Sequence, residues 1–266
     1  MGPVNAIVIA FLMRRFKHGG QKWVGQLIHG FPIIGALSQD STYPTNEKVS
    51  PPSMGAGELF HSMSQRFCER SKGRDSPLSG ELWDEAPQQQ KEGWLHEPIL
   101  VSDDGHALSP QGEALNLAFR FAAPQGDKNR ACGDLRHSLT NRAAAVLAPI
   151  RLVSWDHVAE ISNLFRQFGA VSEFFKCDHK SDYKALPVDP RETKFAVITL
   201  KCPVDGEFYA FISRTLLFGS IASVLRYNVF ARIVTELFTL IFGIPIVAFF
   251  GDCGAQTPPP PSSRRR

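Results

Sequence analysis

Residues 194–212 read KFAVITLKCPVDGEFYAFI, and this stretch decides the fold. Two β-rich runs, 194–201 and 207–212, flank the sequence PVDG at 203–206. An Asp-Gly pair supplies the positive φ angle that a tight hairpin turn needs, so the stretch predicts two antiparallel strands. Helical patterns lie on both sides of this hairpin. The sequence therefore predicts an α+β fold in which helices pack on a mainly antiparallel sheet.

Outside the hairpin, the spacing of apolar residues predicts the other elements. Val158, Ile161 and Phe165 lie on one face of a helix, and Gly243 ends a second, longer helical pattern. The predicted helices span residues 57–70, 155–168 and 220–242. The predicted strands span residues 116–122, 172–177 and 246–250, and Asp134 lies in or just after a further strand.

Length and composition favour a folded chain with an N-terminal part that is packed poorly. The chain has 266 residues, of which 43% are hydrophobic and 21% are charged, and this excludes a wholly disordered protein. Residues 40–92 are rich in proline, glycine and polar side chains and predict little packed structure. We expect a partly irregular N-terminal region at 1–93, an ordered domain at 94–256 and a disordered Pro/Arg tail at 257–266.

Charge and cysteine content place few limits on function. The net charge of +3 is too small to indicate nucleic-acid binding by itself. The five cysteines are widely spaced without a CxxC pair, which favours reduced thiols and an intracellular location in cytoplasm or nucleus.

Two apolar runs raise the question of membrane contact. Residues 4–13 precede Arg14 and Arg15, whereas a signal peptide carries its positive charge first, so a buried or frayed segment is expected. Residues 237–250 are too short for a spanning helix and are broken at 243–245 (GIP). They predict a core helix, a turn and a buried strand, with a membrane-associated segment as the alternative.

Three segments carry residues suited to chemistry. They are 175–183 (FKCDHKSDY), 216–220 (LLFGS) and 249–253 (FFGDC). The first and third place an acid at the end of an apolar run, and the second places a glycine between two elements, where a backbone can approach a ligand closely. Taken singly, each acid is explained as well by a turn or cap role.

In this order and spacing, the three segments resemble the palm motifs of reverse transcriptases of the retrotransposon type that is abundant in dinoflagellate genomes. Residues 125–136 (QGDKNRACGDLR) resemble the fingers segment of that family, and 214–228 resemble its substrate-side loop and helix. The likeness is most specific over 119–255. Residues 29–35 (HGFPIIG) are also similar, without an assignable chemical role. The resemblance implies a fingers/palm fragment of a right-hand polymerase fold.

The resemblance implies a metal site for RNA-directed DNA synthesis. Asp178 and Asp252 would be the catalytic acids and metal ligands, with the backbone carbonyl of His179 as a further ligand. Nucleotidyl transfer of this kind uses two Mg²⁺ or Mn²⁺ ions between the attacking and leaving oxygens. The implied partners are an RNA or DNA template with its primer and deoxynucleoside triphosphates, with no membrane.

The same resemblance implies a nucleotide site. Lys128 and Arg130 would meet the triphosphate, because fixed positive charges suit it. Tyr183 would lie under the sugar and exclude a 2′-hydroxyl group. Phe218 and Gly219 would border the incoming base.

The chain departs from the family pattern at the catalytic hairpin. The family has two adjacent acids there, and Gly251 replaces the first of them, so one carboxylate ligand is lost. Phe249 replaces the usual tyrosine, and Gly133 stands where an acid is common. No segment resembling a thumb subdomain follows Asp252. We therefore expect an impaired or inactive polymerase.

A non-catalytic nucleic-acid-binding protein is the alternative from another functional class. Four basic residues would then line a groove for phosphates: Lys128, Arg130, Arg136 and Arg142. Solvated surface charges explain these residues equally well.

Overall fold

The computed structural model describes residues 5–37, 52–72, 78–125, 128–146, 155–169, 173–179, 182–249 and 252–257. Its contacts divide the chain into two compact units that are each built from separate stretches of sequence. Unit 1 comprises residues 1–4, 25–149 and 183–225, and unit 2 comprises residues 5–24, 150–182 and 226–266. Both combine helices with mainly antiparallel strands, so the mixed class is confirmed. The polymerase architecture and the three predicted domain limits stay predictions.

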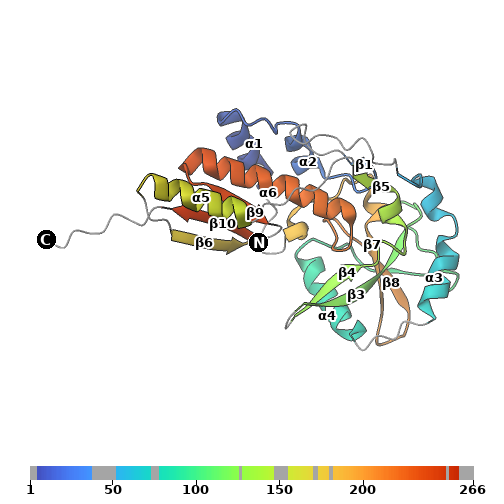
Figure 1. Ribbon diagram of the computed structural model, residues 1–266. Coiled ribbons are helices and arrows are strands. Elements are labelled where there is room, and N and C mark those ends of the chain that lie inside the picture. Colours follow the sequence, from blue (N-terminus) through green and yellow to red (C-terminus); the bar gives the residue numbers. More distant parts are fainter. Residues whose placement is uncertain are drawn as a thin grey trace. The chain divides into compact units, whose positions relative to one another are not determined.

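A mixed sheet with the strand order β2-β8-β7-β3-β4 forms the centre of unit 1 (Figure 1). Neighbouring strands are antiparallel except β3 and β7, which run parallel. The predicted hairpin is confirmed as β7 and β8, with Gly206 in its turn at φ +78°. The strands are β2 (Ile99–Leu100), β3 (Leu117–Gln125), β4 (Lys128–Gly133), β7 (Val197–Lys201) and β8 (Phe208–Ile212).

Helices α3 (Met63–Ser71) and α4 (Ser79–Lys91) cover opposite faces of this sheet (Figure 1). On the α3 face, the ring of Phe67 stacks on Phe119 with centroids 4.8 Å apart. Arg120, the next residue of β3, donates instead to Gln89 on α4 at 3.1 Å. Successive side chains of a strand point to opposite faces, which explains the separation of the two helices.

Helix α4 contradicts the prediction of poor packing in residues 40–92. Leu82, Ala86 and Gln89 are buried on one side of it, and α4 packs against β3 and β7. These three residues recur at helical spacing, but the polar residues between them hide the pattern, and Pro87 weakens the helical signal. Residues 38–51 and 73–77 lie outside the described residues.

The single helix predicted at 57–70 is two helices. A 3-10 helix, η1 (Gly57–Phe60), is followed by α3 after a break at Ser62, whose φ of +58° is incompatible with a continuous helix. Leu59 and Met63 are buried, whereas Phe60 is half-buried.

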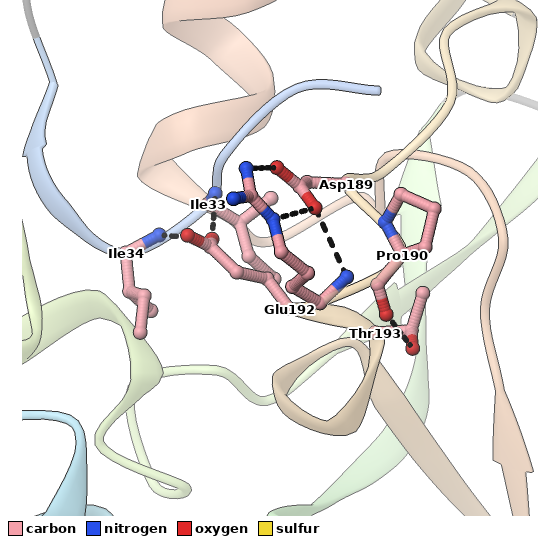
Figure 2. A network of polar contacts seen from close by, with 7 residues as sticks. Ile33, Ile34, Asp189, Pro190, Glu192 and Thr193 are labelled. Carbon is pink, nitrogen blue, oxygen red and sulfur yellow. Dashed lines mark hydrogen bonds and ion pairs between the residues drawn. The ribbon is translucent and has the colours of Figure 1, made fainter. Parts of the chain in front are cut away.

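The HGFPIIG stretch is fixed by backbone contacts within unit 1. Figure 2 shows the Glu192 carboxylate accepting hydrogen bonds from the backbone N–H groups of Ile33 at 2.6 Å and Ile34 at 3.1 Å. Gly30 precedes them at φ +105°, and a Cβ atom there would lie 2.4 Å from the carbonyl oxygen of Val188. This close approach gives the stretch a structural role.

Burial raises the pKa of the Glu192 carboxyl group, although the hydrogen bonds from the two backbone N–H groups oppose that change.

Short elements complete unit 1. Strand β1 (Gly35–Leu37) pairs in parallel with β5 (Ala144–Val146). The remaining 3-10 helices are η2 (Thr140–Arg142), η3 (Asp182–Ala185), whose first residue belongs to unit 2, and η4 (Thr193–Phe195).

Unit 2 contains a three-stranded antiparallel sheet in the order β6-β10-β9 (Figure 1). Its strands are β6 (Glu173–Asp178), β9 (Ile246–Phe249) and β10 (Asp252–Thr257). Its helices are α1 (Ala6–Arg15), α5 (Trp155–Gln167) and most of α6 (Ile221–Phe242). Helices α2 (Trp23–His29) and α6 each have residues in both units. The predicted helices at 155–168 and 220–242 and the strand at 172–177 are confirmed.

Strand β10 was not predicted from the apolar pattern, which ends the strands at residue 250. Residues 252–257 read DCGAQT and lack alternating apolar side chains. Antiparallel pairing with both β6 and β9 makes these residues the central strand instead. Backbone hydrogen bonding therefore determines this strand more than its side-chain pattern does.

The two apolar runs are less buried than predicted. In α1, Met13 is fully buried, whereas Ile7 and Phe11 are 77% and 65% exposed. In α6, Leu237 is buried, but Phe242 near its end is 58% exposed, so the core helix predicted from residue 237 onward is only partly correct. Within the described residues, no helix combines the length and the apolar character needed to cross a bilayer.

Candidate functional site

Two predicted metal-binding acids lie opposite each other in the sheet of unit 2. Asp178 is the last residue of β6, and Asp252 is the first residue of β10. The antiparallel register makes them direct partners. Opposed residues in such a ladder have Cα atoms about 4.5–5.5 Å apart. Two acids that are distant in the sequence therefore meet at one end of this sheet.

The β9–β10 pairing places a hairpin at the predicted catalytic segment. Asp252 is also the register partner of Phe249, so residues 250 and 251 connect the two strands. Both connecting residues lie outside the described part of the chain. The presence of glycine at position 251 is therefore known from the sequence alone.

Helix α6 fixes the backbone that leaves β6. The ring of His179, which follows Asp178, has its Nδ1 atom 2.5 Å from the hydroxyl oxygen of Tyr227. The two rings meet edge to face, and the ring of Phe230 lies 6.4 Å from the His179 ring, centroid to centroid. Tyr227 and Phe230 are buried on α6. These contacts anchor the residue whose backbone carbonyl the resemblance assigns to a metal.

The donor atoms at this end of the sheet suit a divalent cation of the magnesium type. Carboxylate and carbonyl oxygens are the ligands that Mg²⁺ prefers. Asp178 and Asp252 occupy opposed backbone positions, and the backbone carbonyl of His179 follows Asp178 directly. Among the side chains that the structure describes, no group of three or more His, Cys, Asp or Glu residues could hold a metal ion. The side chains of Asp178 and Asp252 are not among those described.

The predicted nucleotide-binding residues gather in unit 1 around Phe218. Its ring lies 4.6 Å from the ring of buried Tyr183, and the exposed Arg130 guanidinium lies 5.4 Å from the centre of the Phe218 ring. Arg130 comes from β4, whereas Tyr183 comes from η3. Lys128 begins β4, two positions before Arg130, and its side chain is not described.

Gly219 allows the loop that carries Phe218 to contact β4. The backbone N–H of Gly133 donates to the carbonyl oxygen of Phe218 at 2.9 Å. Gly219 follows at φ +98°, and a Cβ atom on it would lie 2.1 Å from the carbonyl oxygen of Gly133. The close backbone approach predicted for this glycine is therefore made to the chain itself.

Asn141 joins this loop to the start of α6. Its side-chain amide donates to the carbonyl oxygen of Gly219 at 2.9 Å, and its Oδ1 atom accepts from the N–H of Ile221 at 3.0 Å. The first N–H groups of a helix have no partner inside the helix, so this contact caps α6.

The other basic residues named by the sequence also belong to unit 1. Arg136 and Arg142 are exposed, as is Arg130. Asp134, just before Arg136, accepts from the N–H of His137 and lies 3.5 Å from Arg70. The arrangement is compatible with a phosphate-binding surface and with ordinary solvated charges.

Sequence reasoning missed two cations beside this cluster. Lys184 and Arg120 line a small cavity in unit 1 whose wall also includes Phe218 and Gly133. The available signal was an arginine at the centre of the apolar strand LAFRFA. Lys184 carried no comparable signal, since only folding brings Trp94 beside it.

No family model and no curated protein matches this chain.

Proposed function

We propose that the chain is a reverse-transcriptase-like domain that binds a deoxynucleoside triphosphate and a divalent cation and whose capacity for template-directed nucleotidyl transfer is impaired. The observation that carries this proposal is the direct pairing of Asp178 with Asp252 across β6 and β10. The gathering of Arg130, Tyr183 and Phe218 in unit 1 supports the nucleotide part independently.

The impairment follows from the number of carboxylates. A bound pair of cations would stabilise the negative charge that develops on the attacking and leaving oxygens. Asp178 and Asp252 are the two acids at the paired strand ends, and Gly251 adds no ligand. Fewer ligands favour weak binding of the second cation.

Metal binding is tested with Mn²⁺, which is detected directly by electron paramagnetic resonance. We expect saturable binding to the unmodified chain and its loss in Asp178→Asn and in Asp252→Asn. Asp156→Asn is the matched control, because it removes an exposed acid from α5 in the same unit. Unchanged Mn²⁺ affinity in both sheet variants would refute the metal site.

Nucleotide binding is tested by calorimetric titration with a deoxynucleoside triphosphate. We expect Arg130→Gln to weaken binding, because a guanidinium group forms charge-assisted hydrogen bonds to phosphate oxygens. Arg136→Gln removes an equally exposed positive charge and is expected to change binding little. Equal losses in both variants would indicate only nonspecific attraction between opposite charges.

Activity is tested by primer extension with Mg²⁺ or Mn²⁺. We expect no detectable product from the unmodified chain, and any product from Gly251→Asp should disappear when Asp178→Asn is added. Robust extension by the unmodified chain would show that the missing carboxylate is not limiting.

Nucleic-acid binding without catalysis is the second candidate, and the exposure of Arg130, Arg136 and Arg142 in one unit favours it. The test is binding to an RNA–DNA hybrid at increasing salt. Phosphate contacts release counterions, so affinity should fall steeply as salt rises, and replacement of the arginines should reduce the slope. Absence of binding at low salt would exclude this candidate and weaken the first.

A further inference from the structure

A cavity in unit 1 is lined by two cations that the proposed reaction does not use. Lys184 and Arg120 contribute to its wall together with Trp94, Gln89, Ser213 and Thr215. Its volume is about 10 Å³, which approaches the space that one water molecule occupies. The cavity is therefore suited to an occupant of atomic size.

Arg120 is buried and incompletely bonded. Its side chain is 2% exposed, and its Nη2 atom donates to Gln89 at 3.1 Å and lies 3.5 Å from Glu85. Its Nη1 atom has no hydrogen-bond partner among the described residues. A buried donor of a charged group that lacks a partner is strongly unfavourable, so an acceptor at this position would be stabilising.

Lys184 lies on the same cavity, beside an aromatic ring. Its Nζ atom is 4.6 Å from the centre of the Trp94 ring, and no hydrogen bond or ion pair to it occurs within the described residues. Burial, and then the positive charge of Arg120, lower the pKa of Lys184 to about 8. Glu85 and Glu92 oppose this change but do not cancel it.

We propose that this cavity binds one small inorganic anion, of the size of chloride, between the Lys184 ammonium and the Arg120 guanidinium groups. The Lys184 ammonium group and the Nη1 atom of Arg120 have no hydrogen-bond acceptor among the described residues, which suits a halide ion because it accepts hydrogen bonds from every direction. The nearest carboxylate, that of Glu85, is 49% exposed, so solvent weakens its effect on Arg120. This inference does not depend on the proposed function.

Chloride binding is measured directly by the line width of the ³⁵Cl nuclear magnetic resonance signal. The full chain is titrated with chloride at pH 7 and constant ionic strength, with gluconate as the replacing anion. We expect an excess line width that saturates and that bromide removes by competition. Lys184→Gln should abolish this signal. Lys91→Gln, which removes an exposed positive charge near the end of α4, should retain it.

The outcomes separate the proposal from its alternatives. Absence of a saturable signal, or an equal signal in Lys184→Gln, would overturn it. Displacement by sulfate but not by bromide would also overturn it, because the site would then accept larger oxyanions. Arg120→Lys tests the second cation, and circular dichroism establishes whether that buried variant folds. If it does not fold, the melting temperatures of the unmodified chain and of Lys184→Gln are each compared in gluconate and in chloride. We expect chloride to raise the melting temperature of the unmodified chain and to leave that of Lys184→Gln unchanged.

Discussion

Gly219 is a residue at which one added methyl group should be costly. In Gly219→Ala the Cβ atom meets the carbonyl oxygen of Gly133 at 2.1 Å, and neither backbone can move without breaking the hydrogen bond from Gly133 to Phe218. We expect a loss of at least about 2 kcal/mol in the free energy of unfolding, from the clash together with the positive φ angle. Urea unfolding measured by circular dichroism checks this value.

Gly206→Ala is the matched control for that variant. Gly206 has a similar positive φ of +78° in the β7–β8 turn, but nothing lies within 4 Å of the added Cβ atom. The control should lose only about 1 kcal/mol, the usual cost of a left-handed conformation for alanine. Equal losses in both variants would mean that the contact between Gly219 and Gly133 contributes nothing.

Lys184 should make the stability of the chain depend on pH in the alkaline range. Its pKa is about 8 in the folded state, whereas an unfolded lysine titrates near 10.4. The unfolded chain therefore binds more protons between these values, so stability rises with pH from about 8 to about 10. The contribution, on the order of 1–3 kcal/mol, is lost as the pH falls through 8.

The measurement is the difference in unfolding free energy between the unmodified chain and Lys184→Gln at pH 7, 8, 9 and 10. Other titrating groups cancel in this difference, because both proteins contain them. A difference that does not change with pH would show that Lys184 is solvated in the folded state. If chloride binds as proposed, it should move the rise to higher pH by favouring the protonated amine.

Among the secondary-structure elements, those with local signals were predicted correctly. The β7–β8 hairpin follows from Asp205-Gly206 between two β-rich runs, and α6 ends where Gly243 takes a φ of +66°. Helix α4 and strand β10 were missed because their stability comes from partners far along the chain. Their own side chains carry little periodic signal, and tertiary contacts override such local preference.

The register of β6 and β10 can be tested with cysteines that the chain already contains. Cys177 and Cys253 are partners in this ladder, one position from the paired acids. We expect a short bifunctional thiol reagent to link them within one chain, because opposed residues are closest in an antiparallel sheet. Mass spectrometry of the digested protein identifies the linked peptides.

Two controls give that experiment its meaning. Cys177→Ser should abolish the link between Cys177 and Cys253. After unfolding in urea, this link should form no more often than links from Cys253 to Cys68 or Cys202, which lie in unit 1. A preferred link from Cys253 to a cysteine other than Cys177 in the folded chain would contradict the register. It would also remove the observation that carries the proposed function.

For the molecule as a whole, the sequence suggested residues for a candidate site but did not predict how they are grouped. The resemblance named Asp178, Arg130 and Phe218, but the division of their segments between unit 2 and unit 1 is a property of the folded chain. The cavity residues Arg120, which is buried, and Lys184, which is half-buried, were not predicted, because a cation's burial depends on long-range packing rather than on neighbouring residues.

The two units should also differ in local stability. In unit 1, Val197, Ile198 and Leu200 of β7 are almost completely buried. In unit 2, Phe174 and Phe175 of β6 are 47% and 45% exposed. Segments with few buried apolar contacts open at a lower free energy than core strands.

Hydrogen–deuterium exchange with mass spectrometry measures this difference in one experiment on the intact chain. We expect peptides from β7 and β8 to exchange at least about tenfold more slowly than peptides from β6 and α5, after correction for intrinsic rates. Exchange in β6 should slow on addition of Mn²⁺ if Asp178 binds the cation, whereas β7 should not respond. Equal protection in both units would mean that they unfold together, and an unchanged β6 at saturating Mn²⁺ would argue against metal binding at this strand end.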